Sequence, residues 1–551
     1  MNEVHFHSVT SGIADDQAPR EASDQPRWEF AIARSWRMAL LCSLPVLALF
    51  ALFITTGLRG VDYGYHWDEK DWHIAPGRLM VQTGILLPKS YIYPSFDKWL
   101  VLIPAVARGV GVAIASHGDE AAVQAAMLAM FDGNDYLLRV RSVFIVVSSF
   151  AILWTYGAAL ALRYRPWEAF VAACGVGLSW EFAYHARFAV ADCVMLQFTA
   201  LTIFMLALFH RTGKPTWLYA SSLAAGLAMG TKYPAVILLV WVMVTSVLSL
   251  PRNAYLTQIR RLVSIGAIAS VVYLVTTPGT LLEPFLFVHD TKMISSYYAN
   301  SHHAGHTVSS AWDHGRVVFN FLAFSLFSGH QWIAFPMFVL TVIGAVLWVK
   351  KDLRFAAFLV GFPCLFLLMF CAKYRLMLAR NYLFLLPSLS LLMARAAGDI
   401  SNWIPKPWLR WPLAAGLLGV LAVQVGWEIG ASESIRHVDP NQQVRDALDY
   451  VRKHEDIKFR VSNQVRAKAR ALQLPLPDNV VSAPAGTQVV FFGNAEGPGS
   501  WNFQTNDPWL TKAVWGPREM NFNWYAGWLG HDHLVVMDRE KARATGVPLA
   551  R

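Results

Sequence analysis

The sequence predicts a polytopic α-helical membrane protein with a small α/β domain at its carboxyl end. Of 551 residues, 55% are hydrophobic and only 15% are charged, whereas soluble domains carry about a quarter charged residues. Apolar runs of roughly 17–21 residues recur along the chain, and this length crosses the hydrocarbon layer as a helix. After about residue 431 these runs stop, and Pro, Asn, Gln and charged residues take over.

The first 36 residues are expected to form a disordered cytoplasmic tail. They are polar, mixed in charge and rich in Asp, Ser and Pro, which makes them too long and too acidic for the start of a signal peptide. The first span is therefore expected to stay uncleaved. The five cysteines lie inside or at the ends of apolar runs without a CxxC pair, so neither a disulfide nor a structural zinc site is predicted.

Eleven segments are expected to cross the membrane within a transmembrane region over residues 37–430. Short basic connectors follow every second span; two examples are residues 163–165 and residues 350–354. Positive connectors favour the cytoplasmic side, which predicts an inner amino terminus and an outer carboxyl terminus. The expected spans are 37–57, 142–162, 168–186, 190–209, 216–230, 233–250, 262–278, 331–349, 355–371, 382–398 and 411–430.

Residues 99–115 are ambiguous, because they also resemble a short span. They contain Pro104 and Arg108, and counting them as a span would place all the basic connectors outside. We therefore expect a juxtamembrane helix on the outer surface. Residues 119–131 are expected to form a second amphipathic helix in the same outer loop, which runs over 58–141.

The region 431–551 is expected to be an outer, periplasmic α/β domain. Residues 440–454 have helical periodicity, and Thr487–Phe492 and His533–Met537 are typical of strands. A short helix is expected over Lys541–Thr545. The net charge of +10 does not indicate nucleic-acid binding, because no basic stripe with a nucleic-acid-binding signature is present.

Acidic residues stand out in the first outer loop. Asp68 and Glu69 follow the first span closely, and Asp97 and Lys98 come about thirty residues later. A carboxylate in a partly dry site can act as a general base that deprotonates an incoming hydroxyl. The alternative interpretation is an ordinary solvated acidic pair.

Positively charged residues on the outer side are unexpected, because such residues usually lie in cytoplasmic connectors. Lys232, Arg187 and Arg380 all fall there in the predicted topology. Arginine grips phosphate through two hydrogen bonds and lysine supplies a point charge, so a phosphate site is one interpretation. Snorkelling to the interface or pairing with a carboxylate such as Asp192 is the other. The three together favour phosphate.

These motifs, taken in order, resemble the polyprenyl-phosphate-dependent GT-C glycosyltransferases. The resemblance is to the protein O-mannosyltransferase and lipid A aminoarabinose transferase groups (families 39 and 83), and it covers most of residues 60–400. It is fairly specific for the superfamily and does not specify the sugar. The carrying segments are HWDEKDWHIA (66–75), YPSFDKWL (93–100), LLRVRSV (137–143), ARFAVADCVMLQF (186–198), GLAMGTKYPA (226–235) and ARNYLFLLPSLSLLMARAA (379–397).

The resemblance implies roles for individual residues. Asp68 resembles the catalytic base and Glu69 its partner, while Lys98 resembles the lysine that contacts the carrier phosphate. Lys98 is followed by Trp99-Leu100 where the family has two prolines, which puts the acceptor class in doubt. The other implied positions are Arg139 or Arg141 and Arg380 at the donor phosphate, and Asp97 with His302, His303 or His306 at a metal ion.

The implied activity is transfer of a sugar from a polyprenyl phosphate, such as undecaprenyl phosphate, to an outer-face lipid, glycan or protein by direct inverting displacement. No cofactor is required, and one divalent metal ion is left open. The implied location is a bacterial inner membrane. The alternative is a transporter or flippase for a lipid-linked substrate, but no internal repeat occurs and charges gather at the outer ends of spans.

Overall fold

The computed structural model describes most of the chain. The described residues are 36–61, 68–133, 135–249, 254–300, 307–351, 353–404, 406–436, 440–461, 463–481, 488–492, 511–515 and 534–538. The tail expected over 1–36, apart from Trp36, and the helix expected over Lys541–Thr545 lie outside them.

Helices dominate the described residues, and the long apolar ones coincide with the expected spans. Seven helices have the length and composition to cross a membrane, and three shorter apolar helices accompany them. Six of the long helices and all three shorter ones fall on predicted spans. The long ones lie in α6 (Tyr136–Ala161), α9 (Ala191–Thr212), α12 (Tyr255–Thr276), α16 (Gln331–Lys351), η4–α19 (Ala379–Trp403) and α20 (Pro407–Arg436). The short ones lie in α2 (Trp36–Arg59), η2–α11 (Tyr233–Leu248) and η3–α18 (Ala357–Lys373).

One expected span differs from the prediction. The segment 168–186 is not one continuous helix, because it divides into α7 (Pro166–Gly177) and α8 (Trp180–His185). Ser179 between them has extended backbone angles, and its Oγ accepts a hydrogen bond from the Phe182 amide at 3.3 Å. Such a serine begins a new helix. The segment expected over 216–230 is a single helix, α10 (Pro215–Thr231).

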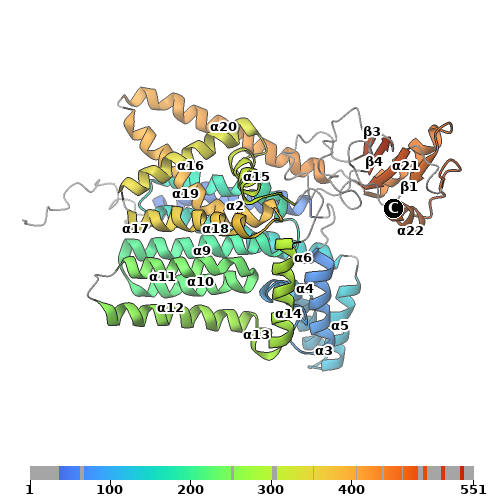
Figure 1. The fold of residues 1–551 in the computed structure, drawn as a ribbon, viewed down its shortest axis with the longest axis horizontal. Helices are drawn as coiled ribbons and strands as arrows, with labels where there is room; N and C mark the ends of the chain where they lie inside the picture. Colours follow the sequence, from blue (N-terminus) through green and yellow to red (C-terminus); the bar gives the residue numbers. More distant parts are fainter. Residues whose placement is uncertain are drawn as a thin grey trace, which may run out of the picture. The chain divides into compact units, whose positions relative to one another are not determined.

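Helix α4 (Phe96–Ala115) contains the segment expected at the outer surface. Its 20 residues have a mean hydropathy of 1.6, so length and composition alone would let it span. Its direction differs, because α4 and α5 (Glu120–Asp132) run across the direction of α9 to α12 instead of alongside them (Figure 1). The surface placement of α4 and α5 stays a prediction from the sequence. Asp119 caps α5 by accepting bonds from the amides of residues 121 and 122 at 3.0 and 3.2 Å.

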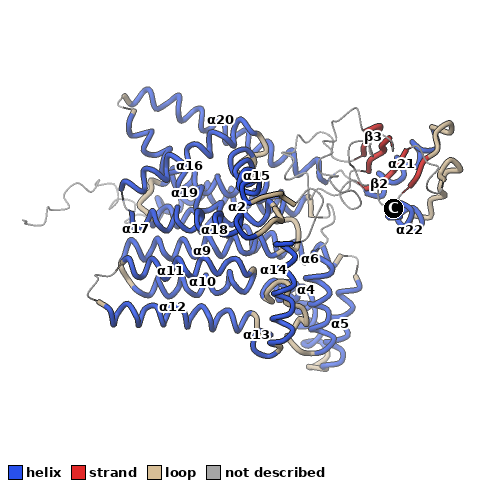
Figure 2. Tube along the Cα trace, in the orientation of Figure 1, coloured by secondary structure: helices blue, strands red, loops and turns tan. Residues whose placement is uncertain are grey.

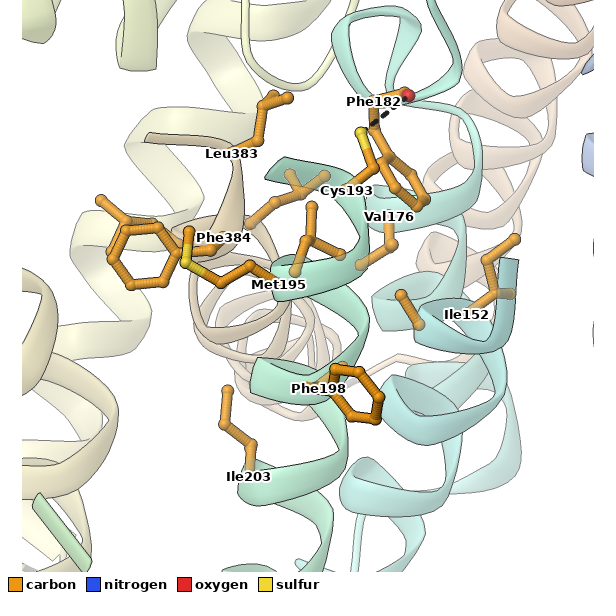
Figure 3. Close-up of a cluster of buried hydrophobic side chains, with 14 of the residues drawn as sticks. Ile152, Val176, Phe182, Cys193, Met195, Phe198, Ile203, Leu383 and Phe384 are labelled. Atoms are coloured by element: carbon orange, nitrogen blue, oxygen red, sulfur yellow. Dashed lines mark hydrogen bonds between the residues drawn. The ribbon is translucent and has the colours of Figure 1, made fainter. Parts of the chain in front are cut away.

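The core lies where α6, α7, α9, α19 and η4 (Ala379–Leu385) pack together. Figure 3 shows Met195 and Phe198 of α9 among Ile152 of α6, Val176 of α7 and Phe384 of η4. Small residues let the helices approach closely in this region. The segment that carries Arg380 is therefore anchored in the most deeply buried part of the chain.

The carboxyl-terminal region forms a four-stranded sheet with two helices (Figure 2). The strand order is β1-β2-β4-β3, with β1 and β2 parallel and the other pairs antiparallel. Strands β2 and β4 lie where strands were expected. The elements are α21 (Pro440–Lys453), β1 (Phe459–Val461), α22 (Asn463–Ala471), β2 (Gln488–Phe492), β3 (Thr511–Trp515) and β4 (Leu534–Asp538).

The contact between α16 and α19 yields a stability prediction. A Cβ atom on Gly344 of α16 would overlap the backbone carbonyl of Leu392 in α19, and backbone cannot move aside as a side chain can. Gly344→Ala should therefore destabilise the fold by about 1–3 kcal/mol, measured as a lower Tm in detergent. Gly419→Ala in α20 has open space around it and should leave Tm equal or higher. Equal Tm values for both variants would contradict the close contact.

Candidate functional site

The acidic pair opens a short π-helix, η1 (Glu69–Ile74), with Asp68 at its amino-terminal end. A π-turn is wider than an α-turn and is frequent at functional sites. Both Asp68 and His73 reach the same residue, Tyr93. The Tyr93 hydroxyl donates to Asp68 Oδ2 at 3.0 Å, and the His73 ring stacks on the Tyr93 ring with centroids 5.2 Å apart.

Asp68 also forms an ion pair with Arg380. The Arg380 Nη2 donates to Asp68 Oδ2 at 2.8 Å, and both side chains are buried. Arg380 belongs to the 3₁₀ segment η4, so the pair joins distant parts of the sequence. The Nε of the same guanidinium lies 3.7 Å from Asp192 Oδ2. Arg380 thus bridges two carboxylates.

Lys232 completes this group from the other side of Asp192. Its Nζ lies 2.5 Å from Asp192 Oδ1 and 2.7 Å from Asn381 Oδ1. It is also 6.0 Å from the centroid of the Tyr93 ring. We call Asp68, Tyr93, Asp192, Lys232, Arg380 and Asn381 the Asp68 network. Two carboxylates face two cations, which compensates the charges that burial has removed from water.

Tyr93 acts as a hydrogen-bond donor within this network. Burial, together with the negative charge of Asp68, holds the pKa of Tyr93 well above its usual value of 10.0. The hydroxyl therefore keeps its proton at physiological pH and directs it at the Asp68 carboxylate. Tyr93 lies within the motif YPSFDKWL, but sequence reasoning did not single it out, because an exposed tyrosine gives the same signal.

Glu69 is bound to Arg141. The Arg141 Nε and Nη2 donate to the two Glu69 carboxylate oxygens at 2.8 and 2.6 Å, which is the bidentate geometry. The Ala189 amide donates to Glu69 Oε1 at 2.8 Å. Glu69 therefore ties η1 to α6 and to the turn that follows α8. Arg139, the other predicted arginine of α6, is exposed.

Lys98 and Asp97 are fully buried at the start of α4. The Lys98 Nζ donates to the carbonyls of Tyr93 and Pro94 at 2.9 and 2.8 Å and lies 3.7 Å from Asp97 Oδ1. Lys98 thereby holds the turn that presents Tyr93. The other Asp97 oxygen meets His73 Nδ1. In the described arrangement, Lys98 is directed at backbone carbonyls and Asp97.

The predicted metal ligands are only partly described. His302, His303 and His306 lie outside the described residues, and the histidine that the structure places beside Asp97 is His73. Within the described part of the chain, no group of three or more His, Cys, Asp or Glu side chains is arranged to hold a metal ion. Asp97 and His73 alone are too few ligands for a complete site. The metal remains a prediction from the sequence.

Arg187 lies in a different group of buried residues. Its Nη1 donates to the Ala183 carbonyl at 2.5 Å, and its Nη2 donates to Ser432 Oγ at 2.6 Å and to the Thr56 carbonyl at 3.2 Å. Glu428 Oε1 is 3.6 Å away. These contacts join α8 to α2 and α20. They match the alternative that this arginine pairs with a carboxylate, although the partner is Glu428 and not Asp192.

A buried histidine fixes the segment that carries Arg380. His314 of α15 (Ala311–Phe324) contacts the Tyr374 carbonyl through Nδ1 at 2.7 Å, and the Tyr382 hydroxyl through Nε2 at 2.6 Å. The carbonyl can only accept, so Nδ1 carries the proton and Nε2 accepts from Tyr382. Burial lowers the pKa of His314 below its usual 6.5. The neutral ring thus fixes η4 at Tyr382, the residue that follows Asn381.

Comparison with known proteins gives one family match. Residues 126–294 match the PMT family, described as dolichyl-phosphate-mannose-protein mannosyltransferase. The matched stretch contains Arg141, Asp192 and Lys232, and it ends before η4. A search of curated protein sequences gave no match.

Three solved structures show weak similarity. ArnT from Cupriavidus metallidurans in the apo state is 14% identical, over 89% of this chain and 97% of that one, with a TM-score of 0.45. The same protein bound to undecaprenyl phosphate is 14% identical over 90% and 97%, with a TM-score of 0.43. The archaeal oligosaccharyltransferase AglB from Archaeoglobus fulgidus, in complex with an inhibitory peptide and a dolichol-phosphate, is 14% identical over 82% and 62%, with a TM-score of 0.43. Since all three scores are below 0.5, no residue role is transferred from them.

The His314 geometry predicts a pH dependence of stability. An unfolded histidine takes up a proton near pH 6.5, whereas folded His314 does so only at lower pH. The unfolded state therefore binds more protons in this window, and stability should fall as the pH drops below about 6.5. His314→Gln should lose less Tm between pH 7.5 and 5.5 than the parent chain does. His289→Gln, at an exposed histidine, should keep the parent's slope; an unchanged slope in His314→Gln would refute the assignment.

Proposed function

We propose that this chain transfers a sugar from a polyprenyl-phosphate carrier to an acceptor at the outer face of the membrane. Residues 126–294 match the PMT family, so the chain is a membrane glycosyltransferase of that family. The observation that carries this proposal is the buried Asp68 carboxylate held by Arg380 and Tyr93. The cluster around Asp68 combines a carboxylate that can act as a base with two cations, Arg380 and Lys232, that can bind a phosphate.

The network residues belong to one end of the helix bundle. Asp192 lies in the first turn of α9, Lys232 follows the last residue of α10, and Arg380 is the second residue of η4. Since α9 and α10 are packed neighbours joined by a short connector, the start of one lies at the end of the other. The basic connector with Arg211 and Lys214 lies at the opposite end. The positive-inside bias then supports an outer location for the network.

The carrier phosphate is proposed to contact Arg380 and Lys232. A guanidinium presents a planar fork of N–H donors that can bind a phosphate through two parallel hydrogen bonds. Both cations are compensated by carboxylates before the donor binds, so the site gains no strong attraction for anions in general. As the sugar–phosphate bond breaks, negative charge grows on the leaving phosphate, and fixed cations in a dry site stabilise it.

Asp68 is proposed as the general base. The acceptor oxygen attacks the anomeric carbon while the bond from that carbon to the phosphate oxygen breaks. The acceptor proton passes to Asp68, and the bonding electrons leave with the carrier phosphate, so the anomeric centre is inverted in one step. Arg380 and Tyr93 orient the carboxylate by their hydrogen bonds to Oδ2, and Glu69 fixes the helix from which Asp68 projects.

Asp68→Asn should lower transfer by about 10²–10⁴-fold, the usual contribution of a general base. The amide keeps the size of the side chain but cannot take the proton. The measurement is release of free carrier from a labelled undecaprenyl-phosphate sugar in membranes that contain the acceptor. Asp71→Asn, at an exposed position of the same helix, is the matched control and should retain activity. Transfer by Asp68→Asn at the parent rate would defeat the assignment.

Arg380→Lys should weaken both donor binding and turnover, because lysine keeps the charge but loses the planar fork of donors. We expect roughly a tenfold or greater loss in affinity for undecaprenyl phosphate, measured by native mass spectrometry, since hydrogen bonds to charged groups contribute about 1.5–3 kcal/mol. Arg139→Lys at the exposed arginine of α6 should bind as the parent does. Equal affinities in the two variants would remove Arg380 from the phosphate site.

A further inference from the structure

An exposed apolar corner lies between α12 and the helix that follows it. Helix α13 (Gly279–Leu282) connects α12 to α14 (Pro284–Asn300), and α14 turns across the direction of α12 (Figure 1). Leu281, Leu282 and Phe285 are 65%, 67% and 91% exposed, and Val288 is exposed as well. We call these four residues the corner patch. Exposed apolar residues gathered in this way indicate a binding surface.

The corner patch continues a lipid-facing surface. Val263, Val271 and Val275 of the candidate span α12 are exposed along its length. Beyond the patch, the exposed side of α14 becomes mixed: His289, Lys292 and Ser296 lie there together with Met293 and Tyr297. A helix at the lipid–water boundary directs its apolar residues toward the acyl chains and its cations toward the lipid phosphates. On α14 the corner patch comes first and Lys292 follows it on the same side.

The opposite side of α14 reaches the segment that carries Tyr93. Asp290 Oδ2 accepts from the Tyr91 amide at 2.7 Å, and the Tyr91 hydroxyl donates to Glu283 Oε2 at 2.6 Å. The Phe287 ring lies 6.0 Å from the Tyr91 ring. Burial and the charge of Asp290 raise the pKa of Tyr91 to about 12, so this hydroxyl remains a donor. Tyr91 precedes, by two residues, the tyrosine that holds Asp68.

The carboxyl end of α14 reaches the strand-like segment before η4. The Tyr298 carbonyl accepts from the amides of Arg375 and Leu376 at 3.0 and 3.1 Å. Helix α14 therefore contacts both approaches to the Asp68–Arg380 pair: the Tyr91–Tyr93 segment near its start and the segment that leads to Arg380 near its end. None of these contacts involves Asp68 itself.

We infer that the corner patch seats α14 in the acyl chains of the bilayer, and that this seat positions Tyr93 and Arg380 around Asp68. The occupant is bulk membrane lipid, because the patch is continuous with the lipid-facing side of α12. Helix α14 is a positioning element that acts through Tyr91 and Tyr298. The positioning part of the inference rests on the proposed glycosyl transfer, whereas the membrane seat does not.

The seat is tested by nitroxide labels in nanodiscs of phosphatidylethanolamine and phosphatidylglycerol. Phe285→Cys and Lys292→Cys are labelled in a chain whose exposed Cys364 is replaced by alanine, and the signal of that parent is subtracted. The label at 285 should collide mainly with dissolved oxygen, and the label at 292 mainly with a water-soluble nickel chelate. Equal nickel access at both positions would overturn the seat. Burial of the label at 285 only after undecaprenyl phosphate is added would assign the patch to the donor's tail, and would overturn it too.

The coupling is tested by Phe285→Ser and Tyr91→Phe, singly and together. Phe285→Ser should lower transfer in nanodiscs by up to about 10²-fold, the cost of a misplacement near 1 Å, while Ser296→Ala on the same side of the helix should not. If both act through one path, the double variant should be no slower than the slower single variant. Multiplied losses, or parent-like transfer by Phe285→Ser, would overturn the coupling. An inactive parent chain would instead count against the proposed function and leave the label result standing.

Discussion

The ion pair between Asp68 and Arg380 is the interaction on which the rest of the site depends. It joins a π-helix after the first span to a 3₁₀ segment that lies 312 residues further along the chain. A carboxylate buried without a partner is costly by several kcal/mol, so the fold must bring η4 to Asp68. The surrounding contacts serve that end: Glu69 with Arg141 fixes η1, and His314 with Tyr382 fixes η4.

Charge balance explains how a buried polar cluster is stable at the end of a helix bundle. Asp68 and Asp192 alternate with Arg380 and Lys232, so each charge has an opposite neighbour within 4 Å. A phosphate that enters must share these cations with the carboxylates. In the proposed reaction this sharing is useful, because charge that grows on the leaving phosphate meets cations already fixed in place.

The buried cations among those predicted for the donor phosphate divide into two groups by what they touch. Lys232 and Arg380 lie in the Asp68 network. Arg141, Lys98 and Arg187 are buried and bind Glu69, backbone carbonyls and Ser432 respectively, which joins separate helices. Those bonds build the scaffold that holds the network. The same residue types therefore make two kinds of contact, and only their partners distinguish the two groups.

The sequence by itself determined the membrane class, most of the long apolar helices and the segments that carry the candidate site, because hydropathy and helix length are local properties. It also brought forward Asp68, Lys232 and Arg380. Only the tertiary structure decided that Ser179 breaks an expected span and that Tyr93 and Asn381 complete the network. It also put His73 beside Asp97, where the sequence had pointed to loop histidines. These features depend on which distant segments meet once the helices pack, and a side chain's partner cannot be determined from its own neighbours in the chain.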